Sequence, residues 1–200
     1  MTKSTKIALL ASLSLLTNVA YAAVPATYNS DATVVGEADA YTGSGYGISV
    51  GNGATLTMTG TQSIAVTSTG GEPVAMNVAK GNLNADVIDI TLKPQSSTVS
   101  TYGKGFILRG NSTGTINTLN SDITLSSVTT AGNGSPDSNA AYGVAVGYNF
   151  NGGGAGDVAK LTVKDATIKV TNTDNTIMGR LSRTFYGFVN VGMESGHQLS

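Results

Sequence analysis

The sequence contains no cysteine and no tryptophan, and its one histidine is His197. Without cysteine the chain can form no disulfide bond and carry no lipoprotein anchor. Zinc sites and the Ser/His or Cys/His catalytic arrangements each lack necessary side chains. We therefore expect no metal, no cofactor and no catalytic residue, and we predict that the protein is not an enzyme.

Charged residues are also scarce, at 12% of the chain, with 11 Lys and Arg against 12 Asp and Glu. They form no basic cluster, so we expect no nucleic-acid site built on phosphate contacts. No segment sustains the 3.6-residue apolar period of a capped helix. The abundance of Gly, Thr, Ser and Asn, together with periodic Val, Ile and Leu, instead predicts an all-β protein.

The only long apolar run lies at the N-terminus. Two lysines precede apolar residues 7–19, and small residues follow at 20–22. At ~1.5 Å per residue this run is too short for a hydrocarbon core of roughly 30 Å. It predicts a Sec signal peptide over 1–22, cleaved between Ala22 and Ala23, and an exported mature chain.

What the sequence does contain is a repeat. Five segments carry aliphatic side chains at alternate positions: 46–51, 74–79, 104–109, 142–147 and 186–191. The first, fourth and fifth of these segments open with Tyr-Gly. The first four are each followed by a second and a third alternating element: 56–58 and 64–66, 83–85 and 90–92, 116–119 and 123–125, 161–163 and 168–170. The step from second to third element is eight residues in the first repeat and seven in the other three.

Aliphatic residues at i and i+2 share one face of an extended strand. Three short strands per repeat, all with one apolar face, predict a parallel β-helix, a solenoid of about four to five coils with irregular loops. Residues 46–200 would form the coils, and 23–45 a cap or lead-in. Turn pairs that can supply positive φ separate the elements: Asn52-Gly53, Gly70-Gly71, Asn133-Gly134 and Asn151-Gly152.

The Tyr-Gly pairs are predicted to mark equivalent corners of successive coils. We expect the tyrosines to stack and the glycines to let the backbone turn close to them. Packing is the favoured role for the rings, and carbohydrate stacking is the alternative. The predicted corner residues are Tyr46, Gly47, Tyr142, Gly143, Tyr186 and Gly187.

The signal peptide, the segment YGISVGNGATLTMTG at 46–60 and the long segment at 141–174 together resemble the N-terminal part of a Gram-negative autotransporter passenger. The resemblance is to the adhesin, pertactin-like class; it covers essentially the whole mature chain and rests on repeat texture. It implies a right-handed parallel β-helix that acts in adhesion, aggregation or biofilm formation.

The same resemblance implies partners and a location. The partner would be a host or bacterial surface molecule or a second copy, with a C-terminal translocator β-barrel in a full-length protein. We expect the cell surface, the outer membrane or the medium as the location, and the periplasm if the chain truly ends at Ser200. Because the sequence stops within the fifth repeat, the non-functional remnant of an interrupted gene is an alternative.

A secreted β-helical polysaccharide lyase or hydrolase is a further alternative. Asp86 and Asp89 are the closest acidic pair in an apolar setting. Three residues apart on a strand, they are predicted to point to opposite faces, which is wrong for paired carboxylate catalysis unless a bulge intervenes. Arg109, before Gly110-Asn111, is interpreted as an ordinary strand end. A membrane barrel is disfavoured, because its strands need about 9–11 alternating residues.

Overall fold

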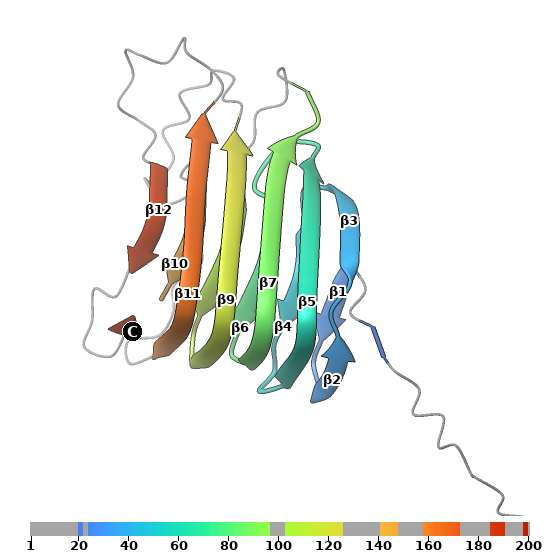
Figure 1. The fold of residues 1–200 in the computed structure, drawn as a ribbon, viewed down its shortest axis with the longest axis vertical. Helices are drawn as coiled ribbons and strands as arrows, with labels where there is room; N and C mark the ends of the chain where they lie inside the picture. Colours follow the sequence, from blue (N-terminus) through green and yellow to red (C-terminus); the bar gives the residue numbers. More distant parts are fainter. Residues whose placement is uncertain are drawn as a thin grey trace, which may run out of the picture.

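A computed structural model of the chain contains two β-sheets whose strands all pair in parallel (Figure 1). It describes residues 20–21, 24–96, 103–125, 141–147, 158–172, 185–190 and 198–199, and no helix occurs in these ranges. The predicted all-β class with parallel pairing is therefore confirmed. The cleavage site at Ala22 and Ala23 and nearly all of the predicted signal peptide lie outside the described residues.

The first sheet, which we call sheet B, is built from short strands. In spatial order they are β1 (Ala26–Tyr28), β4 (Tyr46–Val50), β6 (Val74–Ala79), β8 (Lys104–Arg109), β10 (Ala141–Val146) and β12 (Phe185–Asn190). All five predicted first elements of the repeat are strands of this sheet.

The second sheet, sheet A, contains the long strands. Its spatial order is β2 (Ala32–Val35), β5 (Thr55–Ser68), β7 (Asn82–Pro94), β9 (Ser112–Leu125), β11 (Ala159–Asn172) and β13 (Gln198–Leu199), and β3 (Ala38–Gly43) also pairs with β5. From β4 to β12 the chain passes from one sheet to the other at every step. Spatial neighbours within a sheet are thus equivalent strands of successive repeats.

The register of sheet B agrees with the repeat read from the sequence. Tyr46 pairs with Val74, Val74 with Lys104, Lys104 with Tyr142, and Tyr142 with Tyr186. The residues that open the five segments therefore form one column across the sheet.

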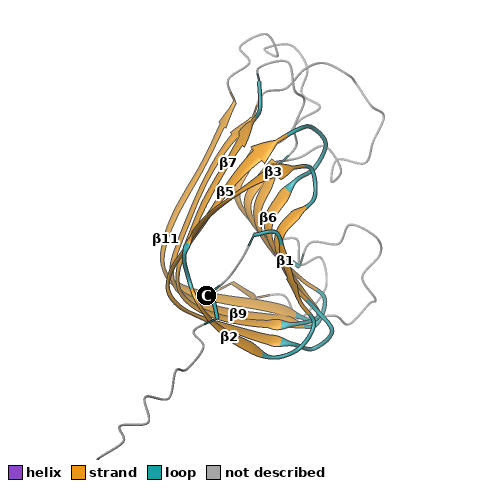
Figure 2. Ribbon diagram, turned by 90° about the vertical axis from the view of Figure 1, so that its right-hand side faces the viewer, coloured by secondary structure: helices purple, strands orange, loops and turns teal. Residues whose placement is uncertain are grey.

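The prediction of three short strands per repeat is wrong, because the second and third elements form a single strand. Each of β5, β7, β9 and β11 contains both elements, and the strand bends between them (Figure 2). In β7 the buried positions change from Leu83 and Ala85 to Ile88, Ile90 and Leu92. The buried residues are thus odd-numbered before the bend and even-numbered after it. In the sequence alone, this interruption of the alternation resembles a break between two strands.

A bulge explains the longer step in the first repeat. Met58 pairs with Ala85 and Thr61 with Val87, so β5 has one more residue than β7 at the bend. The extra stretch contains Gly60, whose φ of 73° lies in the left-handed region. A glycine accepts this conformation at low cost, as a bulge requires.

The predicted alignment of the third repeat is wrong by two residues. Ile116 pairs with Ala85 rather than with Leu83, and Ile123 pairs with Leu92 rather than with Ile90. The positions assigned to these isoleucines hold Gly114 and Ser121 instead. Because side chains alternate with a period of two, the offset leaves Ile116 and Ile123 on the core face.

The core lies between sheet B and the two arms of the bent strands (Figure 2). It contains buried Ile, Leu, Val, Met, Ala and Phe side chains, including Ile48, Met76 and Phe106 of sheet B. Left-handed residues stand at the turn after sheet B, where Asn52, Lys80 and Gly110 have φ values of 54°, 57° and 67°. Asn52 follows β4, Lys80 follows β6 and Gly110 follows β8, and each lies two positions after the last core residue of its strand.

The positive φ predicted for two turn pairs is confirmed. Asn52 and Gly53 have φ values of 54° and 78°, and Gly70 and Gly71 have values of 130° and 71°. The other two predicted turn pairs, at 133–134 and 151–152, lie outside the described residues.

Residues 24–45, within the predicted lead-in, add a further layer to both sheets. β1 pairs with β4 of sheet B, while β2 and β3 pair with the two arms of β5. Before them, Tyr21 forms an isolated bridge to Val35. Cleavage after Ala22 would remove the residue that makes this bridge.

Candidate functional site

The column of predicted corner residues in sheet B is the starting point for a site. Tyr46, Tyr142 and Tyr186 lie in this column, but Val74 and Lys104 separate the first tyrosine from the second. The glycine that follows each tyrosine occupies the next position along its strand. Tyr46 therefore has an aliphatic side chain as its sheet neighbour instead of another ring.

The two tyrosines of this column whose side chains the structure describes differ sharply in exposure. Tyr46 is 43% exposed, whereas Tyr142 is 2% exposed. Neither belongs to the core between the sheets. Tyr142 is thus buried, whereas Tyr46 presents its ring to solvent at the same position of the repeat.

Gly47 has a steric role. A Cβ atom added there would lie 2.5 Å from the carbonyl oxygen of Ala75 and 3.3 Å from Cγ2 of Ile64. Its φ does not lie in the left-handed region. Gly47 thus permits close approach of neighbouring chain segments, while the left-handed turns lie elsewhere.

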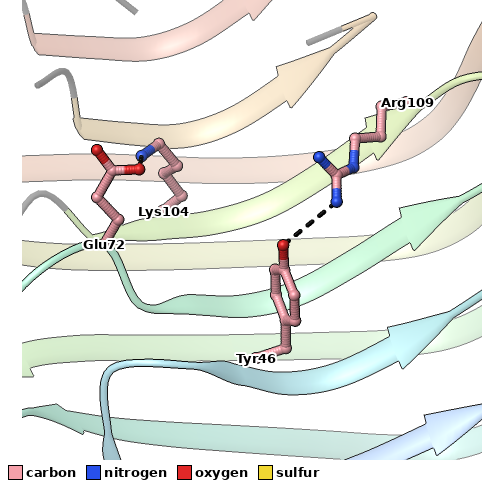
Figure 3. A network of polar contacts seen from close by, with 4 residues as sticks. All are labelled: Tyr46, Glu72, Lys104 and Arg109. Carbon is pink, nitrogen blue, oxygen red and sulfur yellow. Dashed lines mark hydrogen bonds and ion pairs between the residues drawn. The ribbon is translucent and has the colours of Figure 1, made fainter. Parts of the chain in front are cut away.

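The Tyr46 hydroxyl contacts Arg109, which lies two strands away in sheet B. The Nη2 of Arg109, at the end of β8, donates a hydrogen bond to the Tyr46 hydroxyl at 3.3 Å (Figure 3). The strand order β4-β6-β8 means that this contact crosses β6. Arg109 ends β8, as the sequence predicted, and its side chain also reaches the tyrosine.

The outer face of β6 carries an amide with an unused acceptor. Met76 and Val78 point into the core, so alternation places Asn77 between them on the opposite face. Its Nδ2 donates to the Ser49 hydroxyl of β4 at 3.1 Å. Asn77 is only 2% exposed, and its Oδ1 has no hydrogen-bond partner.

A buried ion pair lies further along the same sheet. The Nζ of Lys104 is 3.1 Å from Oε2 of Glu72, and the lysine side chain is fully buried while the glutamate is 34% exposed (Figure 3). Burial lowers the pKa of Lys104, and the nearby Glu72 carboxylate opposes this shift only in part. Lys104 stands in the tyrosine column, and this departure from the repeat is the signal by which the sequence could have identified it.

The outer face of sheet A carries a column of hydrogen-bonded polar side chains. Asn82 donates to the Thr55 hydroxyl at 3.4 Å and accepts from the Thr113 hydroxyl at 2.7 Å. These three residues occupy one position of β5, β7 and β9. These hydrogen bonds between neighbouring strands fix the orientations of the three side chains.

The prediction that Asp86 and Asp89 point to opposite faces is wrong. The bend of β7 lies between Ala85 and Ile88, both buried, so both aspartates lie on the outer face. Each carboxylate accepts a hydrogen bond from the next strand, Asp86 from Asn117 at 3.2 Å and Asp89 from Asn120 at 2.6 Å. Asp86 also accepts from the backbone of Gly60 at 2.9 Å.

The described ranges contain no group of three His, Cys, Asp or Glu side chains that could hold a metal ion, and His197 falls outside those ranges. No helix in the same part of the chain is long and apolar enough to cross a membrane.

Comparison with known proteins gives no relative. No family model, no curated protein and no solved structure matches the chain.

Proposed function

We propose that the two sheets form the walls of a right-handed parallel β-helix. In this arrangement residues 46–200 supply about four to five coils and 23–45 a lead-in. Alternation of the chain between the sheets from β4 to β12 supports it, as does the shared register of equivalent strands. The right hand follows from the strong preference of parallel crossover connections.

We further propose that the chain is a passenger fragment of an exported, surface-associated adhesin of the autotransporter class. It would act in adhesion or aggregation without catalysis. In-register stacking is the observation that carries this proposal, because it arranges outward side chains in columns such as Thr55, Asn82 and Thr113. A long repetitive surface of this kind suits extended contact with a surface molecule or a second copy.

Export is the first part of the proposal to test. The chain would be produced with a C-terminal tag in a Gram-negative host, fractionated, and its N-terminus sequenced. We expect processing between Ala22 and Ala23 and recovery outside the cytoplasm. An Ala22→Lys variant is the control, because a charged residue at the cleavage position should leave the signal attached. A cytoplasmic, unprocessed wild-type chain would contradict the proposal.

Adhesion is the second part. The purified exported chain would be coated on beads and mixed with bacterial and host cells, and its self-association measured by sedimentation velocity. We expect cell binding or concentration-dependent association. A monomer that binds no cell surface would overturn the adhesin assignment.

The polysaccharide-degrading alternative is tested in the same preparation. The shared outer face of Asp86 and Asp89 is the observation that favours it, since carboxylate pairs carry out glycoside hydrolysis. Release of reducing or unsaturated sugar ends from polygalacturonate, abolished by Asp86→Asn and Asp89→Asn, would establish an enzyme. We expect no release.

A further inference from the structure

We propose that the N-terminal layer of strands prevents a second copy of the chain from joining the two sheets end to end, and that the inward carboxylate of Asp39 is the group responsible. The N-terminal layer consists of β1, β2 and β3, which lie at one end of both sheets (Figure 1). The inference limits the surfaces through which copies of the chain can associate, and it does not depend on adhesion to cells.

The N-terminal layer leaves strand edges open. Within the described residues, no strand pairs with the outer side of β1 or of β3, and β2 receives only the bridge from Tyr21. This parallel bridge, with a hydrogen bond from the Val35 amide to the Ala20 carbonyl at 2.8 Å, shows that the edge accepts a further strand. An open edge is a template for pairing with another chain, and soluble proteins commonly block it with an inward-pointing charge.

Asp39 is an inward-pointing charge on β3. It pairs with the buried core residue Ile64 of β5, which in turn pairs with Ile90 of β7. Exposure along β3 alternates in the same sense, because Ala38 and Ala40 are exposed while Asp39 between them is partly buried. The carboxylate therefore stands where the next two repeats place isoleucines.

The surroundings of Asp39 offer its carboxylate little compensation. The Oδ2 atom is buried and has no hydrogen-bond partner. Tyr28 of β1 lies partly buried against the core, where burial raises the pKa of its hydroxyl and the charge of Asp39 raises it further. Residues 24–45 contain the acids Asp31, Glu37 and Asp39 and no Lys or Arg. No cation of the N-terminal layer thus neutralises Asp39.

Both ways of joining a second copy at this end are unfavourable. If two N-terminal layers met, the three acids of one copy would face those of the other, and like charges repel. If the opposite end of a second copy continued the register, Asp39 would lie beside Ile168, the last described residue of its column. The carboxylate would then lose its remaining exposure to water without gaining a counter-ion, which is costly. Association through the outer faces of the sheets carries neither penalty.

Sedimentation velocity of the purified exported chain tests the inference. Asp39→Ile supplies the residue that β5 and β7 have in this column, and we expect it to self-associate at least about tenfold more tightly than the wild type. Ala40→Ile is the matched control, because it adds the same side chain on the exposed side of the same strand. It should stay within about threefold of the wild type. Equal association of wild type and Asp39→Ile, or an equal increase in Ala40→Ile, would overturn the inference.

Two further substitutions separate charge from shape. Asp39→Asn keeps the shape of the side chain and removes its charge, so it should associate about threefold or more tightly than the wild type. Asp39→Glu keeps the carboxylate and should behave as the wild type. An unchanged Asp39→Asn, or an Asp39→Glu that associates like Asp39→Ile, would contradict the role of the charge.

The shape of the assemblies identifies the surface. Negative-stain electron microscopy of Asp39→Ile should show particles joined end to end, and clusters joined side by side would overturn the assignment to the N-terminal layer. Far-UV circular dichroism of every variant establishes that the fold is retained. The outcomes are separate from those of the adhesin proposal. A wild type that binds no cells removes that proposal alone, whereas a folded Asp39→Ile that does not associate removes this inference alone.

Discussion

Lys104→Met is expected to leave the protein as stable as the wild type at pH 7 or to stabilise it. The Lys104 side chain is fully buried, and its sheet neighbours are Val74 and Tyr142. Methionine has a similar length and needs no counter-ion. Removal of the ammonium leaves Glu72, which is 34% exposed and can be hydrated by solvent.

The expected magnitude follows from the balance between desolvation and attraction. Replacement of a buried ion pair by apolar groups is typically neutral or stabilising by about 1–4 kcal/mol. Only one partner changes here and the other is partly hydrated, so we expect a gain of about 0–2 kcal/mol. The control Glu72→Gln leaves the ammonium buried without its carboxylate. It should cost about 2 kcal/mol, below the ~3–5 typical of fully buried pairs, because Glu72 is partly exposed.

The pH dependence gives the sharper test. Burial lowers the pKa of Lys104 in the folded chain below the value of about 10.4 that it has when unfolded. Between these two values the unfolded chain binds more protons than the folded chain, so the wild type gains stability as pH rises through this window. The methionine variant lacks this contribution, so the wild type should improve relative to it on the alkaline side.

The assay is urea unfolding followed by far-UV circular dichroism, at several values between pH 7 and pH 10. Comparison of the two proteins at each pH cancels the other titrating groups. A loss of more than about 1 kcal/mol in Lys104→Met at pH 7 would refute the view that burial dominates over the ion pair. A difference between the proteins that stays constant with pH would refute the lowered pKa.

The same unfolding assay tests three further variants. Gly47→Ala should cost about 1–3 kcal/mol, because its Cβ would lie 2.5 Å from the Ala75 carbonyl oxygen; a cost below about 0.5 kcal/mol would contradict this packing. Deletion of Gly60 should cost less than about 1 kcal/mol, since it removes the extra residue of the bulge; loss of folding would show that the bulge is essential. Ser121→Ile should lower the free energy of unfolding by about 1–3 kcal/mol, although Ser121 pairs with isoleucines on both neighbouring strands. The reason is that the Ser121 side chain already packs closely against Gly105, so a larger side chain has no room there. A stabilised variant would refute this.

The register of sheet B was predictable because its signal is local and repeated. Alternating aliphatic residues define the core face of each short strand, and a shift by one residue would turn that face to solvent. Alignment of Tyr46, Val74, Lys104, Tyr142 and Tyr186 by their position before these aliphatics gives the pairing that the structure has. No knowledge of the loops between the strands is needed for this step.

The long strands were harder to predict because their pattern changes phase. At the bend of β7 two consecutive outward residues, Asp86 and Val87, interrupt the alternation. In the sequence, this interruption of the alternating pattern cannot be distinguished from a turn between two strands. One bent strand is therefore counted as two. The same interruption brings Asp86 and Asp89 to one face, which strict alternation forbids.

The alignment error in β9 has a different cause. Aliphatic residues were matched to aliphatic residues, whereas the structure pairs Leu83 with Gly114 and Ile90 with Ser121. A Cβ at Gly114 would lie 2.8 Å from Cδ1 of Leu161, so the neighbouring strand β11 fills the space that a larger residue would take. Volume shared between neighbouring repeats is a tertiary property and leaves no trace in a single repeat.

The candidate site was predictable only in part. The sequence identified Tyr46 by its place in the repeat, but its partner Arg109 is 63 residues away and belongs to a different repeat. Asn77 follows the same alternation as the other outward residues, so the sequence pattern does not single it out. What sets it apart is that its buried Oδ1 has no hydrogen-bond partner. Contacts of this kind depend on which strands become neighbours in the sheet, so they follow from the strand order and not from the local sequence pattern.

Exposure within a column depends on the place of a residue in the stack as well as on its type. Tyr46 and Tyr142 occupy equivalent positions, yet one is 43% exposed and the other 2%. A regular stack would show the same surface in every repeat, and two contacts break this regularity. Lys104 lies in the column that begins with Tyr46, and Arg109 reaches across β6 to the Tyr46 hydroxyl, so the outer face of sheet B differs from one repeat to the next.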